Sequence, residues 1–252
     1  MKQKKNKEMA AKPSSKAISK AEALVVHLIS GFGLAVAFWV AHNVHSISLT
    51  SHPSLTLRLI WVFECLAVIL LYSRYRKDHE RCSYFKAVGR GLLGLPAGAL
   101  INALGAIVLG APAGIQYLPR TINWSLVMAL FTIAPAASVF GSSWTDWQRI
   151  FAFTKQSTYI LKFDSIRECR CSKLILAIGS TLLIEPVDYM ICLPAHGAVI
   201  GAWFGAFPMP LDWERPWQEW PICVSYGAIV GYLVGIVASL GFMLVRQHVK
   251  GD

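Results

Sequence analysis

The sequence is divided into long apolar runs separated by shorter polar segments. The runs are roughly 17–25 residues long, the length that an α-helix needs to cross a hydrocarbon layer about 30 Å thick. Hydrophobic residues make up 55% of the chain and charged residues only 15%, whereas soluble domains are about 25% charged. This pattern excludes a soluble enzyme, a disordered chain and a coiled coil. It predicts an all-α, polytopic membrane protein.

Six membrane-spanning helices are expected, at about 24–44, 57–72, 91–109, 124–140, 189–207 and 221–245. The stretch 174–207 is long enough for two spans, but it contains Glu185 and Asp188. Each acid near a bilayer centre costs about 2.5–3.5 kcal/mol. We therefore expect a single span there, preceded by a short interfacial helix at 174–184.

The positive charges indicate how these helices are oriented. With six spans, 21 of the 24 Lys and Arg residues fall on one side of the membrane, in 1–23, 74–90, 149–173 and the tail after 245. Positive charge concentrates in cytosolic loops, so both termini are expected in the cytosol. The formal net charge of +10 also suits nucleic-acid binding, but charges confined to loops between apolar spans disfavour that function.

The chain divides into two expected regions. Residues 1–23 carry seven lysines and no apolar period, so they are expected to form a disordered, basic cytosolic arm. Residues 24–252 are expected to form one six-helix transmembrane domain.

Two of the expected helices carry glycines at every fourth position. These glycines are Gly197, Gly201 and Gly205 in the fifth helix, and Gly227, Gly231 and Gly235 in the sixth. Small residues four apart lie on one side of a helix and let a neighbouring backbone approach closely. The pattern predicts close helix packing, within the chain or with a partner. The alternative is that glycine is simply frequent in membrane helices.

Residues 207–221, which we call the link, join these two helices. The link contains four prolines, three tryptophans, three acids and one arginine, so we expect it to be rigid and non-helical. Tryptophan suits the headgroup level of a membrane, and the arginine can pair with the acids or with a lipid phosphate. The link residues expected at a partner or lipid interface are Asp212, Trp213, Glu214, Arg215, Pro216, Trp217 and Trp220.

Two polar residues lie deep in the expected spans, Glu64 in the second and Asn102 in the third. An intramembrane acid is by default a candidate functional site. The alternatives are that Glu64 is protonated, or that it pairs with a residue on another helix, for which Asn102 is a candidate. The spans contain no second acid that would form a proton relay with it.

The sequence shows no pattern typical of a metal site, a cofactor site or an active site. The only closely spaced cysteines, Cys169 and Cys171, lack the second pair that a zinc site normally has. There is no glycine-rich phosphate loop and no nucleophile beside a base. A protein without catalytic activity, metal or cofactor is therefore expected.

The segment from Val199 through the link to Ile222 resembles the phosphatidylinositol-glycan biosynthesis class F family. Its Trp and Pro positions carry the resemblance, together with Gly227, Gly231 and Tyr232 and with the run Leu109-Gly110-Ala111-Pro112. The resemblance implies a non-catalytic subunit of the endoplasmic reticulum membrane. Such subunits bind and stabilise the large catalytic subunits that transfer phosphoethanolamine from phosphatidylethanolamine to mannoses of the glycosylphosphatidylinositol (GPI) anchor. It also marks about 156–186 as an insertion.

Two other functions stay open. A small transporter or lipid scramblase would line a cavity with polar residues, for which Glu64 and Asn102 are the deep candidates. A lipid-modifying enzyme would place Asp212, Glu214 and Arg215 at its site. Membrane lipids are expected partners in every case, while the transferase that is bound and the number of copies are not specified by the sequence.

Overall fold

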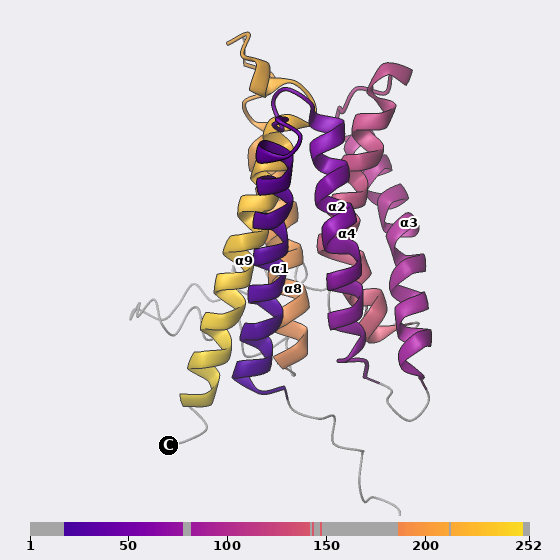
Figure 1. Cartoon of the computed structure of the whole chain (residues 1–252), viewed down its shortest axis with the longest axis vertical. Coiled ribbons are helices and arrows are strands. Elements are labelled where there is room, and N and C mark those ends of the chain that lie inside the picture. The colour runs from indigo at the N-terminus through magenta and orange to yellow at the C-terminus, as the bar shows by residue number, and fades with distance from the viewer. Residues whose placement is uncertain are drawn as a thin grey trace, which may run out of the picture.

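Six long helices lie side by side as a bundle in the computed structural model (Figure 1). The structure describes residues 18–77, 82–141, 143, 147, 186–211 and 213–248. All six of these helices are long and apolar enough to cross a membrane, which confirms the prediction of an all-α, polytopic membrane protein. Three expected regions lie outside the described residues: most of the arm, the helix at 174–184, and the insertion at 156–186 except for Pro186.

The helices of the bundle are α1 (Lys20–Asn43), α2 (Pro53–Ser73), α3 (Tyr84–Val108), α4 (Leu118–Phe140), α8 (Pro186–Ala206) and α9 (Ile222–His248). Two short 3-10 turns, η1 (Ile115–Tyr117) and η2 (Pro216–Gln218), precede α4 and α9.

Most helices begin before the apolar run that predicted them, because their first turns are built from capping residues and prolines. α1 begins at Lys20 rather than at residue 24, since Ser19 and Glu22 form a capping box in which each side chain bonds the other's backbone N–H. α2 begins with Pro53 in its first turn, a position where proline loses no helical hydrogen bond.

α8 begins at Pro186, three residues before the expected span, and so includes Asp188. The Asp188 carboxylate accepts a hydrogen bond from the Lys77 ammonium group at 3.1 Å. The same ammonium group lies 4.6 Å from the ring centre of Phe140 at the end of α4. The helix therefore extends three residues beyond the expected span and includes a paired acid, which does not carry the full cost of an isolated one.

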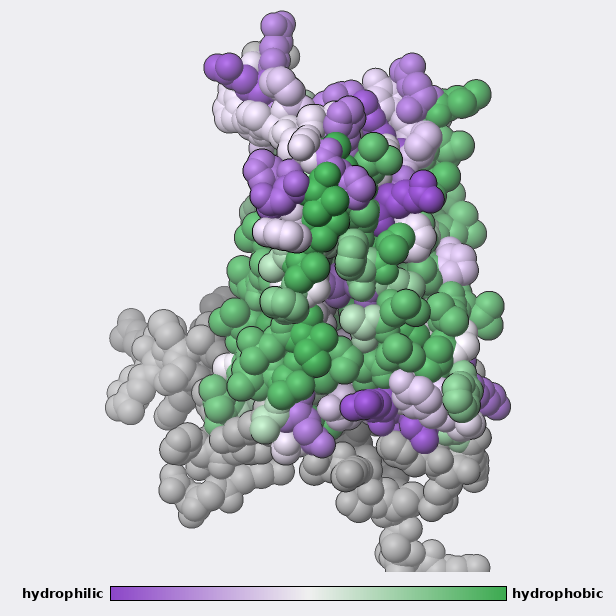
Figure 2. Space-filling model, in the orientation of Figure 1, coloured by the Kyte–Doolittle hydropathy of each residue, from purple (hydrophilic) through white to green (hydrophobic). Residues whose placement is uncertain are grey.

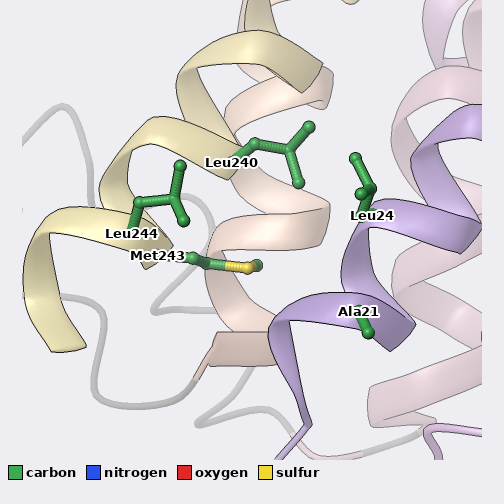
Figure 3. A pocket seen from close by; sticks show the side chains of 5 residues that line it. All are labelled: Ala21, Leu24, Leu240, Met243 and Leu244. Carbon is green, nitrogen blue, oxygen red and sulfur yellow. The ribbon is translucent and has the colours of Figure 1, made fainter.

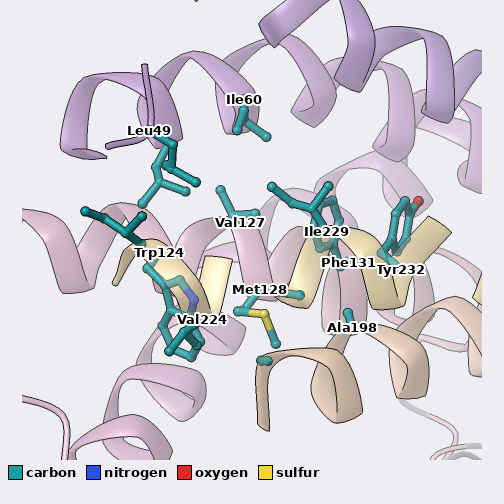
Figure 4. Packing of buried hydrophobic residues seen from close by; sticks show 14 of the residues in the cluster. Leu49, Ile60, Trp124, Val127, Met128, Phe131, Ala198, Val224, Ile229 and Tyr232 are labelled. Carbon is teal, nitrogen blue, oxygen red and sulfur yellow. The ribbon is translucent and has the colours of Figure 1, made fainter. Parts of the chain in front are cut away.

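α4 is the central helix of the bundle and contacts α2, α3, α8 and α9. Its buried side chains meet residues of α2 and of the α1–α2 loop on one side and residues of α8 and α9 on the other (Figure 4). The Phe131 ring of α4 stacks on the Tyr232 ring of α9 with centres 4.1 Å apart. This central packing connects the α8–α9 pair to the rest of the bundle.

A wide apolar band surrounds the bundle between two more polar ends (Figure 2). It includes outward-facing residues such as Leu93 and Leu100 of α3 and Val234 of α9. The two described ends of the chain share one cluster: Ile18 and Met243 lie with Phe140 and Val187. The link is at the opposite end of the bundle (Figure 1).

Candidate partner interface

The link is closed onto itself by one buried side chain, that of Gln218 in η2, which is 9% exposed. Its Nε2 donates hydrogen bonds to the carbonyl oxygens of Pro208 at 2.6 Å and Leu211 at 2.7 Å. Its Oε1 accepts a hydrogen bond from the backbone N–H of Arg215 at 2.9 Å. Three points of the link are thus held together by a residue that was not a candidate in the sequence analysis.

A second set of contacts fastens the end of the link to α4. Trp220 is 6% exposed, its Nε1 donates to Thr121 Oγ1 at 3.0 Å, and its ring centre lies 5.1 Å from that of Trp124. Arg120 forms an ion pair with Glu219 and donates to the carbonyl of Trp220. Trp220 is therefore buried at the end of the bundle. The sequence analysis had instead grouped it with the tryptophans expected at the level of the lipid headgroups.

Most of the remaining candidates of the link face outward, but Trp217 is half-buried and also packs against the cluster that contains Trp124 and Trp220. Trp213 is 56% exposed, and its ring meets the Trp217 ring edge to face with centres 5.9 Å apart. Glu214 and Arg215 are exposed between them, and Glu214 has a φ of +50°, which is uncommon for residues other than glycine. Pro216, also exposed, begins η2, and Asp212 lies outside the described residues. The link thus has a braced inner side and an outer side with aromatic and charged groups.

The six glycines lie between α8 and α9, the helices that carry the link. A Cβ atom added at Gly201 would be 2.9 Å from the Cα atom of Gly231, and one added at Gly227 would be 3.0 Å from the Cα atom of Gly205. Gly197 faces Gly231 in the same way, and Gly235 faces Leu193 and Pro194. The two backbones therefore touch along the whole stripe. The sequence left open whether these glycines pack within the chain or against a partner. The structure shows packing within the chain.

Glu64 and Asn102 do not come together. Glu64 is 1% exposed and its carboxyl group packs against Gly33 of α1. Asn102 donates a hydrogen bond of 2.8 Å to the carbonyl of Gly98 in its own helix, α3. The Glu64 carboxyl group thus packs on a glycine, a contact that no sequence pattern had indicated.

No three His, Cys, Asp or Glu side chains in the described part of the chain gather closely enough to hold a metal ion. Cys169 and Cys171 lie outside this part.

A sequence model of the GPI biosynthesis protein family Pig-F matches residues 23–240. The match extends from the first turn of α1 to α9 and includes the link, the glycines and Glu64. The chain belongs to this family. The residues that match the Pig-F family therefore include the link as well as residues of all six helices of the bundle.

Three curated relatives of the Pig-F chain illustrate the similarity. The "GPI ethanolamine phosphate transferase, stabilizing subunit" of Mus musculus is 33% identical over 133 residues, which are 53% of this chain and 48% of the relative. The "PIGF/3-ketodihydrosphingosine reductase fusion protein" of Schizosaccharomyces pombe is 32% identical over 149 residues, 59% of this chain and 24% of the relative. The "Glycosylphosphatidylinositol anchor biosynthesis protein 11" of Pyricularia oryzae is 30% identical over 157 residues, 62% of this chain and 47% of the relative.

The chain thus spans about half or less of the length of these curated relatives. No solved structure matches the chain.

Proposed function

We propose that this chain is a non-catalytic membrane subunit that binds and stabilises a phosphoethanolamine transferase of GPI-anchor biosynthesis in the endoplasmic reticulum. The observation that carries the proposal is the Pig-F family match over residues 23–240, which spans all six described helices. The name of the mouse relative, a stabilizing subunit of a GPI ethanolamine phosphate transferase, supports the same role.

The outer side of the link is the surface that we assign to the transferase. Tryptophan and arginine are enriched among the residues that dominate protein interfaces, and Trp213, Arg215 and Trp217 present both types on one short segment. Because Gln218 and Trp220 brace the inner side, little conformational freedom is lost when the outer side binds. Pre-organisation of this kind increases affinity without new contacts.

The glycine stripes support this surface indirectly. Their contacts hold α8 and α9 together, and these two helices carry the two ends of the link. The apolar band of the bundle remains available to membrane lipids and to spans of the partner (Figure 2).

The orientation that we propose places both termini in the cytosol and the link in the lumen. It rests on the 21 of 24 positive residues that fall on one side of a six-span chain. The two described ends of the chain lie at one end of the bundle, opposite the link, which agrees with this arrangement.

Affinity purification of the tagged chain from membranes in mild detergent, followed by mass spectrometry, tests the proposed partnership. A GPI phosphoethanolamine transferase should co-elute in an amount comparable to that of the chain. A chain that elutes without any transferase, while remaining folded, would contradict the proposal.

A further inference from the structure

The core between α1, α2 and α9 contains buried polar atoms that lack hydrogen-bond partners. His27 and Ser30 of α1 and Glu64 of α2 are each 2% exposed or less. One polar atom of each is unpaired: His27 Nδ1, Ser30 Oγ and Glu64 Oε1. Leaving a buried polar group unpaired is unfavourable, so three such atoms in adjoining helices indicate that something else satisfies them.

The polar groups of these three residues lie along one side of α1. The Glu64 carboxyl group packs on α1 at Gly33, where an added Cβ atom would be 3.0 Å from Glu64 Cδ. Ser30 and His27 precede Gly33 at successive intervals of three residues, each about 4.5 Å along a helix. Residues three apart are neighbours on a helix surface, so the polar groups of His27 and Ser30 and the carboxyl group at Gly33 follow one another along α1.

Two tyrosines and a serine complete the polar surroundings. Tyr232 of α9 lies near both Ser30 and Glu64, although Ser30 Oγ has no partner within hydrogen-bonding geometry. Tyr72 of α2 also lies near Glu64, but its hydroxyl group donates to the carbonyl of Met190 at 3.2 Å. His27 Nε2 is paired with Ser239 Oγ at 3.2 Å.

Glu64 has no cationic partner in this core. The ion pairs of the described residues join Lys77 to Asp188 and Arg120 to Glu219, and neither includes Glu64. His27 faces Ser239 with one ring nitrogen and leaves the other unpaired. An isolated carboxylate is strongly unfavourable in an apolar interior, whereas a neutral carboxyl group both donates and accepts hydrogen bonds.

We propose that this core is a buried hydration site, in which ordered water molecules bridge Glu64 Oε1, Ser30 Oγ and His27 Nδ1 and in which Glu64 is the neutral acid. Buried water typically makes about three hydrogen bonds to groups that are otherwise unsatisfied. The unpaired atoms, together with the Tyr232 hydroxyl group, supply such partners from α1, α2 and α9. Gly33 is required because it leaves room for the carboxyl group on the α1 backbone.

The proposed hydration site connects α1 to α9 near a region where the apolar packing between these two helices is incomplete. Near the start of α1 and the end of α9, an apolar crevice of about 200 Å³ separates the helices (Figure 3). It is lined by Ala21, Leu24, Leu240, Met243 and Leu244. The His27–Ser239 hydrogen bond lies next to this crevice in both helices. The polar groups thus add a contact between α1 and α9 to the apolar packing of α1 in the core.

Infrared spectroscopy of the purified full-length chain tests the site directly. A protonated carboxyl group has a C=O stretching band that is separate from the amide bands, and Glu64→Gln should remove the part of it that belongs to Glu64. Ser30→Ala should shift this band because a bridged neighbour is lost. Ser125→Ala, which removes a buried hydroxyl group of α4 bonded to its own helix, should leave it unchanged. Absence of a Glu64 band, or an identical band in the Ser30→Ala variant, would overturn the proposal.

Thermal unfolding separates a hydration site from a site that needs a carboxylate. Glu64→Gln keeps a neutral hydrogen-bonding group and should retain the wild-type midpoint. Glu64→Leu removes that group, and its midpoint should fall by about 2–4 °C. A Gln variant that falls as far as the Leu variant would show that the ionised carboxylate is needed, and the neutral site would be wrong.

Discussion

The backbone carbonyl group of Gly197 in α8 occupies the place where a side chain on Gly231 in α9 would begin. A Cβ atom added at Gly231 would lie 2.9 Å from the Gly197 carbonyl carbon, and one added at Gly197 would lie 3.0 Å from the Gly231 carbonyl carbon. The two backbones are therefore in direct contact. In lipid, helix association depends on such van der Waals contact rather than on the expulsion of water.

A single methyl group on the stripe should weaken this contact. We expect Gly231→Ala to lower the free energy of unfolding by about 1–3 kcal/mol, the usual range for overpacking. Gly241→Ala is the matched control, because Gly241 lies in the same helix with nothing within 4 Å of an added Cβ atom. The measurement is the thermal unfolding midpoint in detergent. Equal midpoints for the two variants would mean that the α8–α9 contact does not stabilise the bundle.

The link should lose its fixed shape when Gln218 is truncated. Gln218→Ala leaves the carbonyl groups of Pro208 and Leu211 without their donor, and an unsatisfied buried group costs about 1–3 kcal/mol. We expect faster hydrogen–deuterium exchange in residues 208–218. Gln116→Ala, an exposed glutamine in η1, serves as the control. Unchanged exchange in the Gln218 variant would show that the link is held by other contacts.

The sequence predicted the helices better than it predicted the structure of the link. Apolar runs predicted six helices because the bilayer imposes a minimum length on each one. The four-residue glycine period predicted close packing because it places the glycines on one helical face. The first turns of α1 and α2 were missed because Ser19, Glu22 and Pro53 are polar or turn-forming residues that act through capping.

The sequence did not distinguish the tryptophans of the link. Trp213 is exposed, Trp217 is half-buried, and Trp220 packs on Trp124, yet all three have similar neighbours in the chain. The difference arises from Thr121 and from the pair of Arg120 with Glu219, which are about 100 residues apart in sequence. Contacts of this kind depend on tertiary structure and have no local pattern. The Gly33–Glu64 contact was missed for the same reason.

The exposed tryptophan of the link, Trp213, should matter for the partner and not for the fold. We expect Trp213→Ala to lower the amount of co-purified transferase at least tenfold, which corresponds to about 1.4 kcal/mol, with an unchanged unfolding midpoint of the isolated chain. Trp203→Ala in α8, which is equally exposed, is the control. If Trp203→Ala lowers co-purification as much as Trp213→Ala does, the contact lies on the helices and not on the link.

The proposed orientation is open to a labelling test in sealed microsomes. Single cysteines placed at Trp217 and Lys250 in a chain without its other cysteines should react differently with a membrane-impermeant reagent. Position 250 should react from the outside, and position 217 only after permeabilisation, because the charge distribution favours a luminal link. Reaction of position 217 in intact vesicles would reverse the assignment.

The central claim is that the chain acts by stabilising a transferase and takes no part in the chemistry. The most direct measurement compares cells with and without this chain for two quantities: the half-life of the transferase by pulse-chase, and the phosphoethanolamine transfer per transferase molecule in isolated membranes. We predict a shortened half-life in the absence of the chain, with transfer per remaining transferase changed by less than threefold, which is less than about 0.7 kcal/mol of barrier. A normal half-life combined with a thousandfold loss of transfer per molecule, about 4 kcal/mol of barrier, would contradict the account and assign the chain a part in the reaction.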